Sequence, residues 1–311
     1  MVGRATAHII SQRRTPDRDD WFIEAAVSQF WDRYRNSDSF DLPMALPDSR
    51  IRASWAGMCA RRIAYSVAGH EESNPTTAAD AWRFNVGSML HETIQDVILA
   101  RFPGSTAETK VRLSEIGSGH IDIVLTKADG KRVVIEIKTI NGFGFRRMFG
   151  RDGEGPRYGG VVQGALNAAA LDPPADELML VVFSLEVMSS VQAQKLGLIS
   201  EFKRFAAQWT YTRDEFMQIA HEETVRLRRI IELVDQGDLQ YVPRIIPDPS
   251  LPPHEVINPS KGTIAVKNHE GLRVGVQSTW HCNYCGFQDH CQKDYDREQA
   301  AIAEAKEPVV A

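Results

Sequence analysis

Charged residues interrupt an otherwise apolar stretch of β-strand sequence between Gly119 and Thr139. Asp122 lies in one predicted strand, and Glu136 and Lys138 lie in the β-branched strand that follows it. Because unpaired buried charge is costly, these side chains need partners or a metal ion. Two carboxylates beside an ammonium form the oxygen-rich kind of site that Mg²⁺ or Mn²⁺ prefers. An ion held there can activate water and stabilise charge on a phosphate.

The turn between the two strands decides whether these three side chains face the same way. Glu136 and Lys138 are two residues apart and therefore share one face of their strand. A three-residue loop at 128–130 places Asp122 opposite Glu136, whereas a two-residue turn sends its side chain to the other face. The three-residue loop requires Gly130 in the left-handed conformation. We therefore predict a shared face with Gly130 at positive φ.

The cysteines form a second group of residues that could bind a metal ion or take part in chemistry. The chain contains four, namely Cys59, Cys282, Cys285 and Cys291. The last three have the spacing Cys-x₂-Cys-x₅-Cys. In a cytosolic protein such spacing favours metal or cluster ligation over disulfides, and zinc and iron–sulfur both suit four thiolates. Structural disulfides or inert thiols remain an alternative, as do His281 and His290 as substitute ligands. Arg61 and Arg62 could neutralise thiolate charge, contact phosphate, or simply form a solvated helix face.

Composition limits the class of protein. The chain has 311 residues, of which 43% are hydrophobic and 25% charged, as is ordinary for a soluble globular protein. No apolar run approaches a membrane span, no phosphate-binding loop of an ATP-driven motor is present, and the N-terminus lacks a secretory apolar core. We therefore expect a cytoplasmic location and no membrane partner. With a net charge of −5, any nucleic-acid surface must be a local basic patch.

Helices and strands alternate around the central hairpin. A helix capped by Ser54 carries Cys59, and a longer one carries His91 at the edge of its buried stripe. A capping box at Thr212 marks the start of a long helix, and a proline-rich stretch at 243–262 indicates an irregular connection. The expected elements are helices at 19–35, 54–69 and 78–102, a strand at 108–114, a helix at 158–171, strands at 177–187 and 204–211, a helix at 212–236 and a small hairpin at 264–276.

A glycine-rich loop of mixed character is expected at 141–160, directly after Lys138. Arginines alternate there with aromatic residues: Arg146, Arg147, Arg151 and Arg157 with Phe143, Phe145, Phe149 and Tyr158. Basic and aromatic side chains on a flexible segment suit backbone contact and base stacking on single strands. The alternative is a solvated loop whose aromatic rings turn inward.

Several of these motifs together resemble a known superfamily. Gly119-x-x-Asp122 followed by Glu136-x-Lys138 resembles the core of the PD-(D/E)XK nucleases. Gly-x-x-x-His91 on the preceding helix resembles the first motif of the RecB-like group. One upstream cysteine with a C-terminal Cys-x₂-Cys-x₅-Cys resembles the iron–sulfur RecB-like exonucleases, which include the CRISPR-associated four-cysteine nucleases and the nuclease domain of AddB. The chain departs from the family at Gln163-x-x-x-Asn167, where the family has tyrosine.

The resemblance implies an α/β fold with a restriction-endonuclease-like core, in which helices flank a mixed central sheet. It also implies a helical C-terminal subdomain clamped by iron and sulfur. On this basis residues 1–50 form an N-terminal arm and helix, and residues 51–295 form the nuclease domain. A proline-rich insertion lies at about 240–278, and residues 296–311 form a tail.

The resemblance also implies a function, namely metal-dependent exonuclease cleavage of DNA in recombination, repair or DNA processing. The expected substrate is single-stranded DNA ends, cut from 5′ to 3′. His91, Asp122, Glu136 and the carbonyl of Ile137 would hold Mg²⁺ or Mn²⁺, with Lys138 and Gln163 assisting catalysis. The four cysteines would hold a 4Fe–4S cluster. The alternative is a zinc- or iron–sulfur-stapled DNA-binding subunit that accompanies a helicase or a recombination or integration complex.

Overall fold

The computed structural model describes residues 21–25, 50–74, 78–149, 153–198, 200–249, 251–279 and 281–304. The chain divides into two compact units. One contains Met58–Asp80 and the chain from Arg228 onwards, and the other contains Ala81–Leu227 and the chain before Met58. Residues 1–20, most of the helix expected at 19–35, the end of the tail and Arg151 lie outside the described residues.

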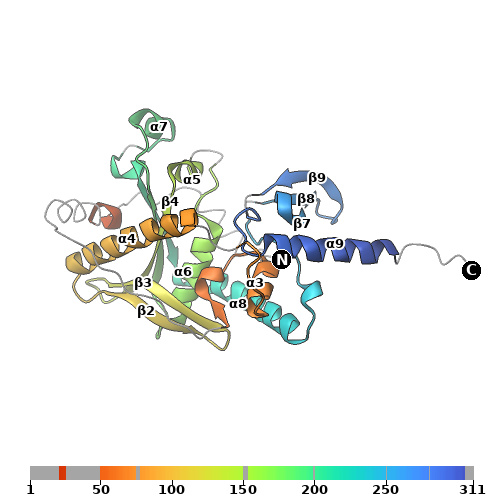
Figure 1. The fold of residues 1–311 in the computed structure, drawn as a ribbon. Helices are drawn as coiled ribbons and strands as arrows, with labels where there is room; N and C mark the ends of the chain where they lie inside the picture. The colour runs from red at the N-terminus through yellow and green to blue at the C-terminus, as the bar shows by residue number, and fades with distance from the viewer. Residues whose placement is uncertain are drawn as a thin grey trace, which may run out of the picture. The chain divides into compact units, whose positions relative to one another are not determined.

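A mixed six-stranded sheet forms the centre of the unit that contains Ala81–Leu227 (Figure 1). Its path runs β1-β3-β4-β5-β6, with β2 also paired to β3. The β1–β3 and β4–β5 pairs are parallel, and the other pairs are antiparallel. The strands are β1 Ile51–Arg52, β2 Thr106–Leu113, β3 Gly117–Thr126, β4 Arg132–Ile140, β5 Glu177–Ser184 and β6 Ala206–Thr212.

Helices α4 (Ala78–Arg101) and α6 (Tyr158–Ala170) cover opposite faces of this sheet. Ile94 and Ile98 of α4 belong to a buried cluster with Ile135 and other alternate residues of β3, β4 and β5. Because side chains alternate along a strand, Glu136 points to the other face, where it lies against α6 at Gly164. The expected α/β class, with a mixed central sheet flanked by helices, is confirmed.

The register of the central hairpin is also as predicted. Ile123 pairs with Ile135, and the same register continued by one residue places Asp122 opposite Glu136. The loop closes with a hydrogen bond from Lys127 N to Lys131 O at 2.8 Å, and Gly130 has φ +82°. The three-residue loop and its left-handed glycine are therefore confirmed.

The elements after the hairpin follow the expected order, with several short additions. Thr212 and Glu215 form the capping box that begins α8 (Arg213–Asp235). A short helix, α7 (Ser190–Lys195), follows β5, and a 3₁₀ turn, Phe202–Arg204, precedes β6. None of the helices in the described ranges is both long and apolar enough to cross a membrane.

The Ser54-capped helix was a wrong prediction. Ala53–Trp55 forms only a 3₁₀ turn, and the helix α3 (Ala60–Val67) begins later, with Cys59 at its N-cap position. Gly57 separates the two because it has φ +73°, which does not continue a helix, and its N–H donates to Glu223 at 2.9 Å.

The unit that contains α3 also holds a three-stranded antiparallel sheet and the helix α9 (Gln288–Glu304). The strands are β7 His254–Asn258, β8 Thr263–Lys267 and β9 Arg273–Ser278, where the sequence predicted only a hairpin of two. Its small apolar core consists of Ile246, Val256 and Ile264, against which Cys59 and Cys282 pack.

Candidate active site

The candidate site begins where β3 and β4 part. Instead of a ladder bond, the N–H of Ile137 donates to Oδ2 of Asp122 at 2.6 Å. Nε2 of His91, on α4, lies 2.6 Å from the carbonyl oxygen of Ile137, and its Nδ1 lies 3.8 Å from Oδ1 of Asp122. The structure thus brings together three of the four groups that the sequence suggested as metal ligands.

Glu136 and Lys138 meet on the side of the sheet that α6 covers. Glu136 is completely buried, and Nζ of Lys138 lies 2.6 Å from its Oε1. The same ammonium donates to Oε1 of Gln163 at 2.9 Å. Gln163 therefore accepts a hydrogen bond from the Lys138 ammonium, and its part in catalysis stays a prediction.

Asn167 is a site residue to which sequence reasoning gave no role. It stands where the nuclease family that the sequence resembles has tyrosine, and it is fully buried. Its Nδ2 donates to the carbonyl of His120 at 2.9 Å and to Oε2 of Glu136 at 3.3 Å. The spacing of Asn167 in the sequence could have indicated this position, because a residue four positions after Gln163 lies on the same helix face.

Glu108 was missed altogether. The register between β2 and β3, with Ala107 opposite Ile123, places Glu108 opposite Asp122. Three carboxylates thus lie in line across β2, β3 and β4. Glu108 has φ +50°, a conformation that is uncommon outside glycine, and it accepts a hydrogen bond from Gln95 at 2.6 Å. No local sequence pattern indicated this register.

Burial controls the charge of the carboxylates. Burial raises the pKa of Asp122 to about 6 and that of Glu136 to about 7, although Lys138 lowers both. Burial alone would lower the pKa of Lys138, but Glu136 and Asp122 raise it overall. Burial and Lys138 together lower the pKa of His91, so its imidazole is neutral at pH 7 and can act as a ligand.

The chemistry of this donor set fits a hard divalent cation. It offers two buried carboxylates, one carbonyl and a neutral imidazole, and it contains one more carboxylate than ammonium. The donor atoms do not surround a common point. Within the described ranges, no group of three or more His, Cys, Asp or Glu residues is spaced to hold a metal ion. The direct contact between His91 Nε2 and the Ile137 carbonyl would have to open if both became ligands.

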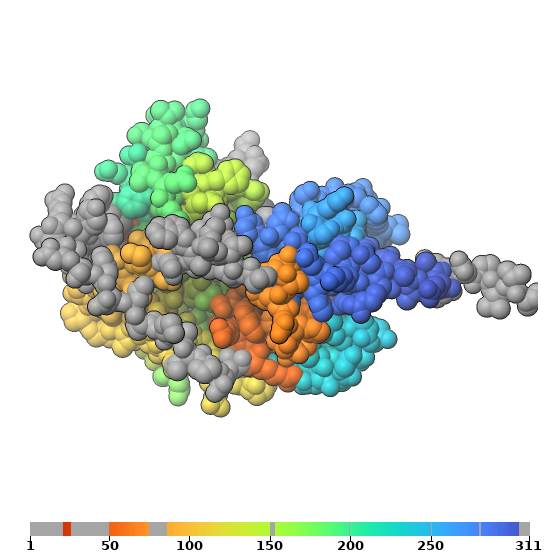
Figure 2. All heavy atoms as spheres, in the orientation of Figure 1, coloured from red at the N-terminus to blue at the C-terminus, as the bar shows by residue number. Residues whose placement is uncertain are grey.

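The segment after β4 is more ordered than the sequence suggested. A helix, α5 (Gly142–Arg147), begins at Asn141, whose side chain caps it by accepting the N–H of Gly144 at 2.7 Å. Figure 2 shows α5 at the surface beside the segment that leads to α7. Because this helix replaces much of the expected loop, its side chains have defined positions.

Most of the aromatic rings in this segment are buried rather than offered to a ligand. Phe145 and Phe149 lie against each other, and Phe149 stacks on Trp209. Tyr158 is also buried, so its ring is not presented for base stacking. Phe143 is 62% exposed, and the guanidinium of Arg147 lies 5.7 Å from the centre of its ring.

The arginines of this segment lie at the surface with partial pairing. Arg146 is 4.0 Å from Glu186, and Arg147 pairs with Glu154. Arg157 is exposed and precedes the first residue of α6. The position of Arg151 is outside the described residues. The DNA-contacting role of these arginines remains a prediction.

All four cysteines belong to the unit that contains α3 and α9. Each is a free, partly buried thiol. Cys282 and Cys285 form one turn, in which Cys285 N donates to the carbonyl of Cys282 at 3.1 Å. Burial, and to a smaller extent the neighbouring thiols of Cys59, Cys285 and Cys291, together raise the pKa of Cys282 to about 12. The four sulfurs are therefore close enough to influence one another.

A group of four neighbouring thiols fits the chemistry of zinc or of an iron–sulfur cluster. As at the carboxylates, the side chains in the described part of the chain are not spaced to enclose a metal ion. The thiols gather in one place, but the ligand set stays a prediction.

Comparisons with known proteins give weak likenesses only. No protein-family model matches the chain, and no curated protein sequence matches it. A structure described as SSO0001 is similar over 88% of this chain and 96% of its own, with 15% identity and a TM-score of 0.43. A phage-related exonuclease from Haemophilus somnus 129PT covers 75% of this chain and 94% of its own, with 12% identity and a TM-score of 0.39. Likenesses this weak carry no argument about activity.

The raised pKa values predict how a divalent cation changes stability with pH. In the metal-free protein, Asp122 and Glu136 have folded-state pKa values of about 6 and about 7, above their ordinary values. Their contribution to stability is therefore fully present below about pH 4 and is lost as the pH rises to about 7. A divalent cation bound to the ionised carboxylates would offset this loss.

We therefore expect Mg²⁺ to raise the unfolding temperature more at about pH 8 than at about pH 5. The measurement is thermal unfolding with and without Mg²⁺ at both pH values, and the Glu136→Gln variant serves as the comparison. An equal rise at both pH values, or an undiminished rise in Glu136→Gln, would show that the cation binds elsewhere.

Proposed function

We propose that this protein is a metal-dependent deoxyribonuclease that hydrolyses phosphodiester bonds. The observation that supports this most strongly is the convergence of Asp122, Glu136 and Lys138 where β3 and β4 part. Buried carboxylates that outnumber their ammonium partner are costly unless a cation joins them. A hard cation beside a positioned ammonium is an arrangement suited to stabilising charge on a phosphate.

His91, Asp122, Glu136 and the carbonyl of Ile137 are the groups that would hold Mg²⁺ or Mn²⁺. When bound, the ion would supply Lewis acidity at the scissile phosphate. Lys138 is held in its charged form by Glu136 and Asp122, so we infer that it acts as a cation and hydrogen-bond donor toward the attacking water and the phosphate. Gln163 keeps its ammonium in place.

The proposed substrate is the end of a single DNA strand, with cleavage from 5′ to 3′. The support for a single strand is the surface of α5, which follows β4 within a few residues of Lys138. It combines the exposed ring of Phe143 with Arg146 and Arg147. An exposed ring beside cationic side chains suits base stacking and phosphate contact.

Phe143→Ala tests this surface. We expect it to weaken binding to a single-stranded oligonucleotide about tenfold and to leave duplex binding nearly unchanged, because only unpaired bases can stack on the ring. Binding is measured by fluorescence anisotropy without divalent cations, so that no cleavage occurs. Phe143→Trp should retain affinity.

Val191→Ala is the matched control, because Val191 is 63% exposed and lies on α7. It should bind both substrates as the wild type does. Equal affinity of Phe143→Ala and the wild type for the single strand would remove Phe143 from the DNA-binding surface.

A cleavage time course tests the proposed polarity and the need for a free DNA end. Linear single strands labelled at either end, circular single strands and duplexes are incubated with Mg²⁺ or Mn²⁺. Progressive shortening from the 5′ end, with circles left intact, is the expected result. Cut circles would indicate an endonuclease, and shortening from the 3′ end would reverse the proposed polarity.

A second candidate function has its own support. The direct hydrogen bond between His91 and Ile137, and the absence of a closed metal-binding group in the described residues, fit an accessory DNA-binding subunit with little activity. Such a subunit would work with a helicase or a recombination or integration complex. DNA binding without cleavage in the same time course would favour it.

We also propose that Cys59, Cys282, Cys285 and Cys291 hold a 4Fe–4S cluster, with zinc as the competing occupant. The support is the proximity of the four thiols and the use of every cysteine in one group. When bound, such a group would supply a covalent link between α3 and the segment around Cys282–Cys291.

A further inference from the structure

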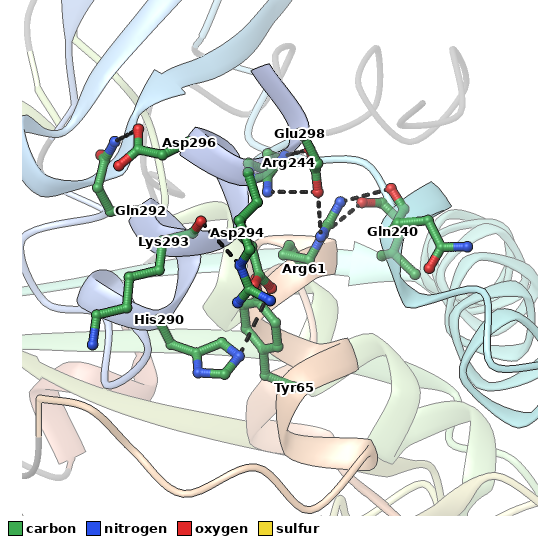
Figure 3. A network of polar contacts seen from close by, with 12 residues as sticks. Arg61, Tyr65, Gln240, Arg244, His290, Gln292, Lys293, Asp294, Asp296 and Glu298 are labelled. Atoms are coloured by element: carbon green, nitrogen blue, oxygen red, sulfur yellow. Dashed lines mark hydrogen bonds and ion pairs between the residues drawn. The ribbon is translucent and has the colours of Figure 1, made fainter. Parts of the chain in front are cut away.

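Many cations in the described part of the chain are paired with a carboxylate. In the unit that holds α9, for example, Arg61 and Arg244 both bind Glu298 (Figure 3). A group of residues on β1, β2 and β3 differs, because its lysine and its two arginines bind no carboxylate among the described residues. This group, which we call the cationic face, consists of Arg52 of β1, Lys110 and Arg112 of β2, and Ser118 and His120 of β3.

Strand pairing places the members of the cationic face side by side. Ser118 is paired with Arg52 on one side and with Arg112 on the other, and His120 is paired with Lys110. Side chains two residues apart on a strand point to the same side and lie about 7 Å apart. The basic members are all exposed, so they present their charges to solvent together.

The buried residues between them hold the cationic face in place. Val111, Leu113 and Ile121 alternate with its members along β2 and β3, the yellow strands of Figure 1, and are buried. Because side chains alternate along a strand, burial of these residues directs their neighbours to the outside. The nearest acid of β2, Glu108, accepts a hydrogen bond from Gln95 of α4 at 2.6 Å and is thereby engaged. The positive charges are therefore neither scattered nor neutralised.

The chemistry of the cationic face fits a phosphate backbone. Lysine, arginine and serine are side chains that commonly contact phosphate oxygens. In the described chain, every strongly exposed large hydrophobic side chain lies outside β1, β2 and β3. The cores of protein interfaces are enriched in aromatic and apolar residues, and membrane-surface elements insert apolar ones. A nucleic acid therefore suits this face better than a protein or a membrane does.

We propose that the cationic face binds the phosphate backbone of the DNA that reaches the carboxylate site. His120 precedes Asp122 by two residues, so about 7 Å of β3 joins the face to the site. The His120 carbonyl also accepts from Asn167, which contacts Glu136. Contacts of this kind position a strand without reading its sequence. The inference rests on the proposed function only in taking DNA as the ligand.

The test is the salt dependence of DNA binding in a variant that combines Arg52→Gln, Lys110→Gln and Arg112→Gln. Each neutralised phosphate of a single strand releases counterions and contributes about 0.7 to the slope of log affinity against log salt concentration. The variant should therefore lose about 2 from this slope and bind about tenfold or more weakly at about 100 mM salt. Binding of the full chain to a labelled single-stranded oligonucleotide is measured by fluorescence anisotropy in EDTA, between about 50 and about 200 mM sodium chloride.

A second triple variant is the matched control, because it removes the same charge from other exposed positions of the same unit. It combines Arg101→Gln, Lys131→Gln and Lys195→Gln and should keep the wild-type slope. Equal reductions of the slope in both triple variants would show an effect of net charge alone and would overturn the inference.

The charge-preserving combination of Arg52→Lys, Lys110→Arg and Arg112→Lys should also keep the slope, because counterion release depends on the charge. Charges on edge strands can instead serve to prevent pairing with other chains. A glutamine variant that aggregates but binds DNA with the wild-type slope would support that role and contradict ours. If the glutamine variant does not fold, Lys110→Gln alone should lower the slope by about 0.7, and no change there would be equally decisive against the inference.

The outcomes also separate this inference from the proposed nuclease activity. An unchanged slope in the glutamine variant removes the cationic face and leaves the nuclease proposal standing. Wild-type protein that shows the expected difference in slope but never cuts DNA does the reverse. Wild-type protein that binds no DNA would overturn both.

Discussion

Asp122→Asn and Lys138→Ala are each expected to lower the rate of DNA cleavage about 1,000-fold or more, with the fold retained. Asp122→Asn keeps an oxygen that can accept the N–H of Ile137, so the junction of β3 and β4 survives while the charge is lost. Lys138→Ala removes a cation whose contribution is largest when negative charge develops on the phosphate. Neither variant should lose most of its affinity for DNA.

Asp129→Asn is the matched control for the carboxylate, because Asp129 lies in the exposed turn of the same hairpin. Its cleavage rate should equal that of the wild type. The measurement is initial rates on end-labelled single strands, with circular dichroism to verify folding. Activity within about tenfold of the wild type in either site variant would show that its role is misassigned.

Cys59→Ser is expected to abolish the colour of anaerobically purified protein and to expose the C-terminal segment to proteases. Cys59 stands before α3, whereas the other three cysteines lie around the start of α9, so a shared centre closes a very long loop. The apolar core of this unit is small and includes Cys59 and Cys282 at its edge. Loss of the centre should therefore increase the rate of proteolysis about tenfold or more.

Ser278→Ala, at an exposed position of β9, is the control for the cysteine variant and should keep both colour and protease resistance. Metal analysis identifies the occupant, because zinc gives the same protection in a colourless protein. Anaerobically reconstituted protein that takes up zinc but no iron would contradict the iron–sulfur assignment. Protease resistance of Cys59→Ser equal to that of the wild type would contradict any link through this residue.

The hairpin could be predicted because its determinants are local. Alternation of side chains along Ile121–Leu125 and Val133–Ile137 sets the faces, and one glycine at the turn sets the register. The main helices and strands of the larger unit also lie within a few residues of their expected bounds. These elements have strong periodicity or clear caps, such as the Thr212 box of α8.

The features that were not predicted depend on contacts between distant parts of the chain. Gly57 ends the turn at 53–55 where its N–H reaches Glu223, far along the sequence. The rings of Phe145 and Phe149 turn inward because Trp209 of β6 lies beneath Phe149. Asn167 and Glu108 reach the site only through the packing of α6 and the register of β2.

Cleavage of end-labelled single-stranded DNA by metal-stripped protein, titrated with Mg²⁺, tests the central claim most directly. The account predicts no cleavage in EDTA, a rate that rises to saturation with Mg²⁺ or Mn²⁺, and no comparable rise in Asp122→Asn assayed beside it. Wild-type protein that binds the DNA but leaves it intact at every concentration of either ion would contradict the account. So would cleavage that is equal in wild type and Asp122→Asn.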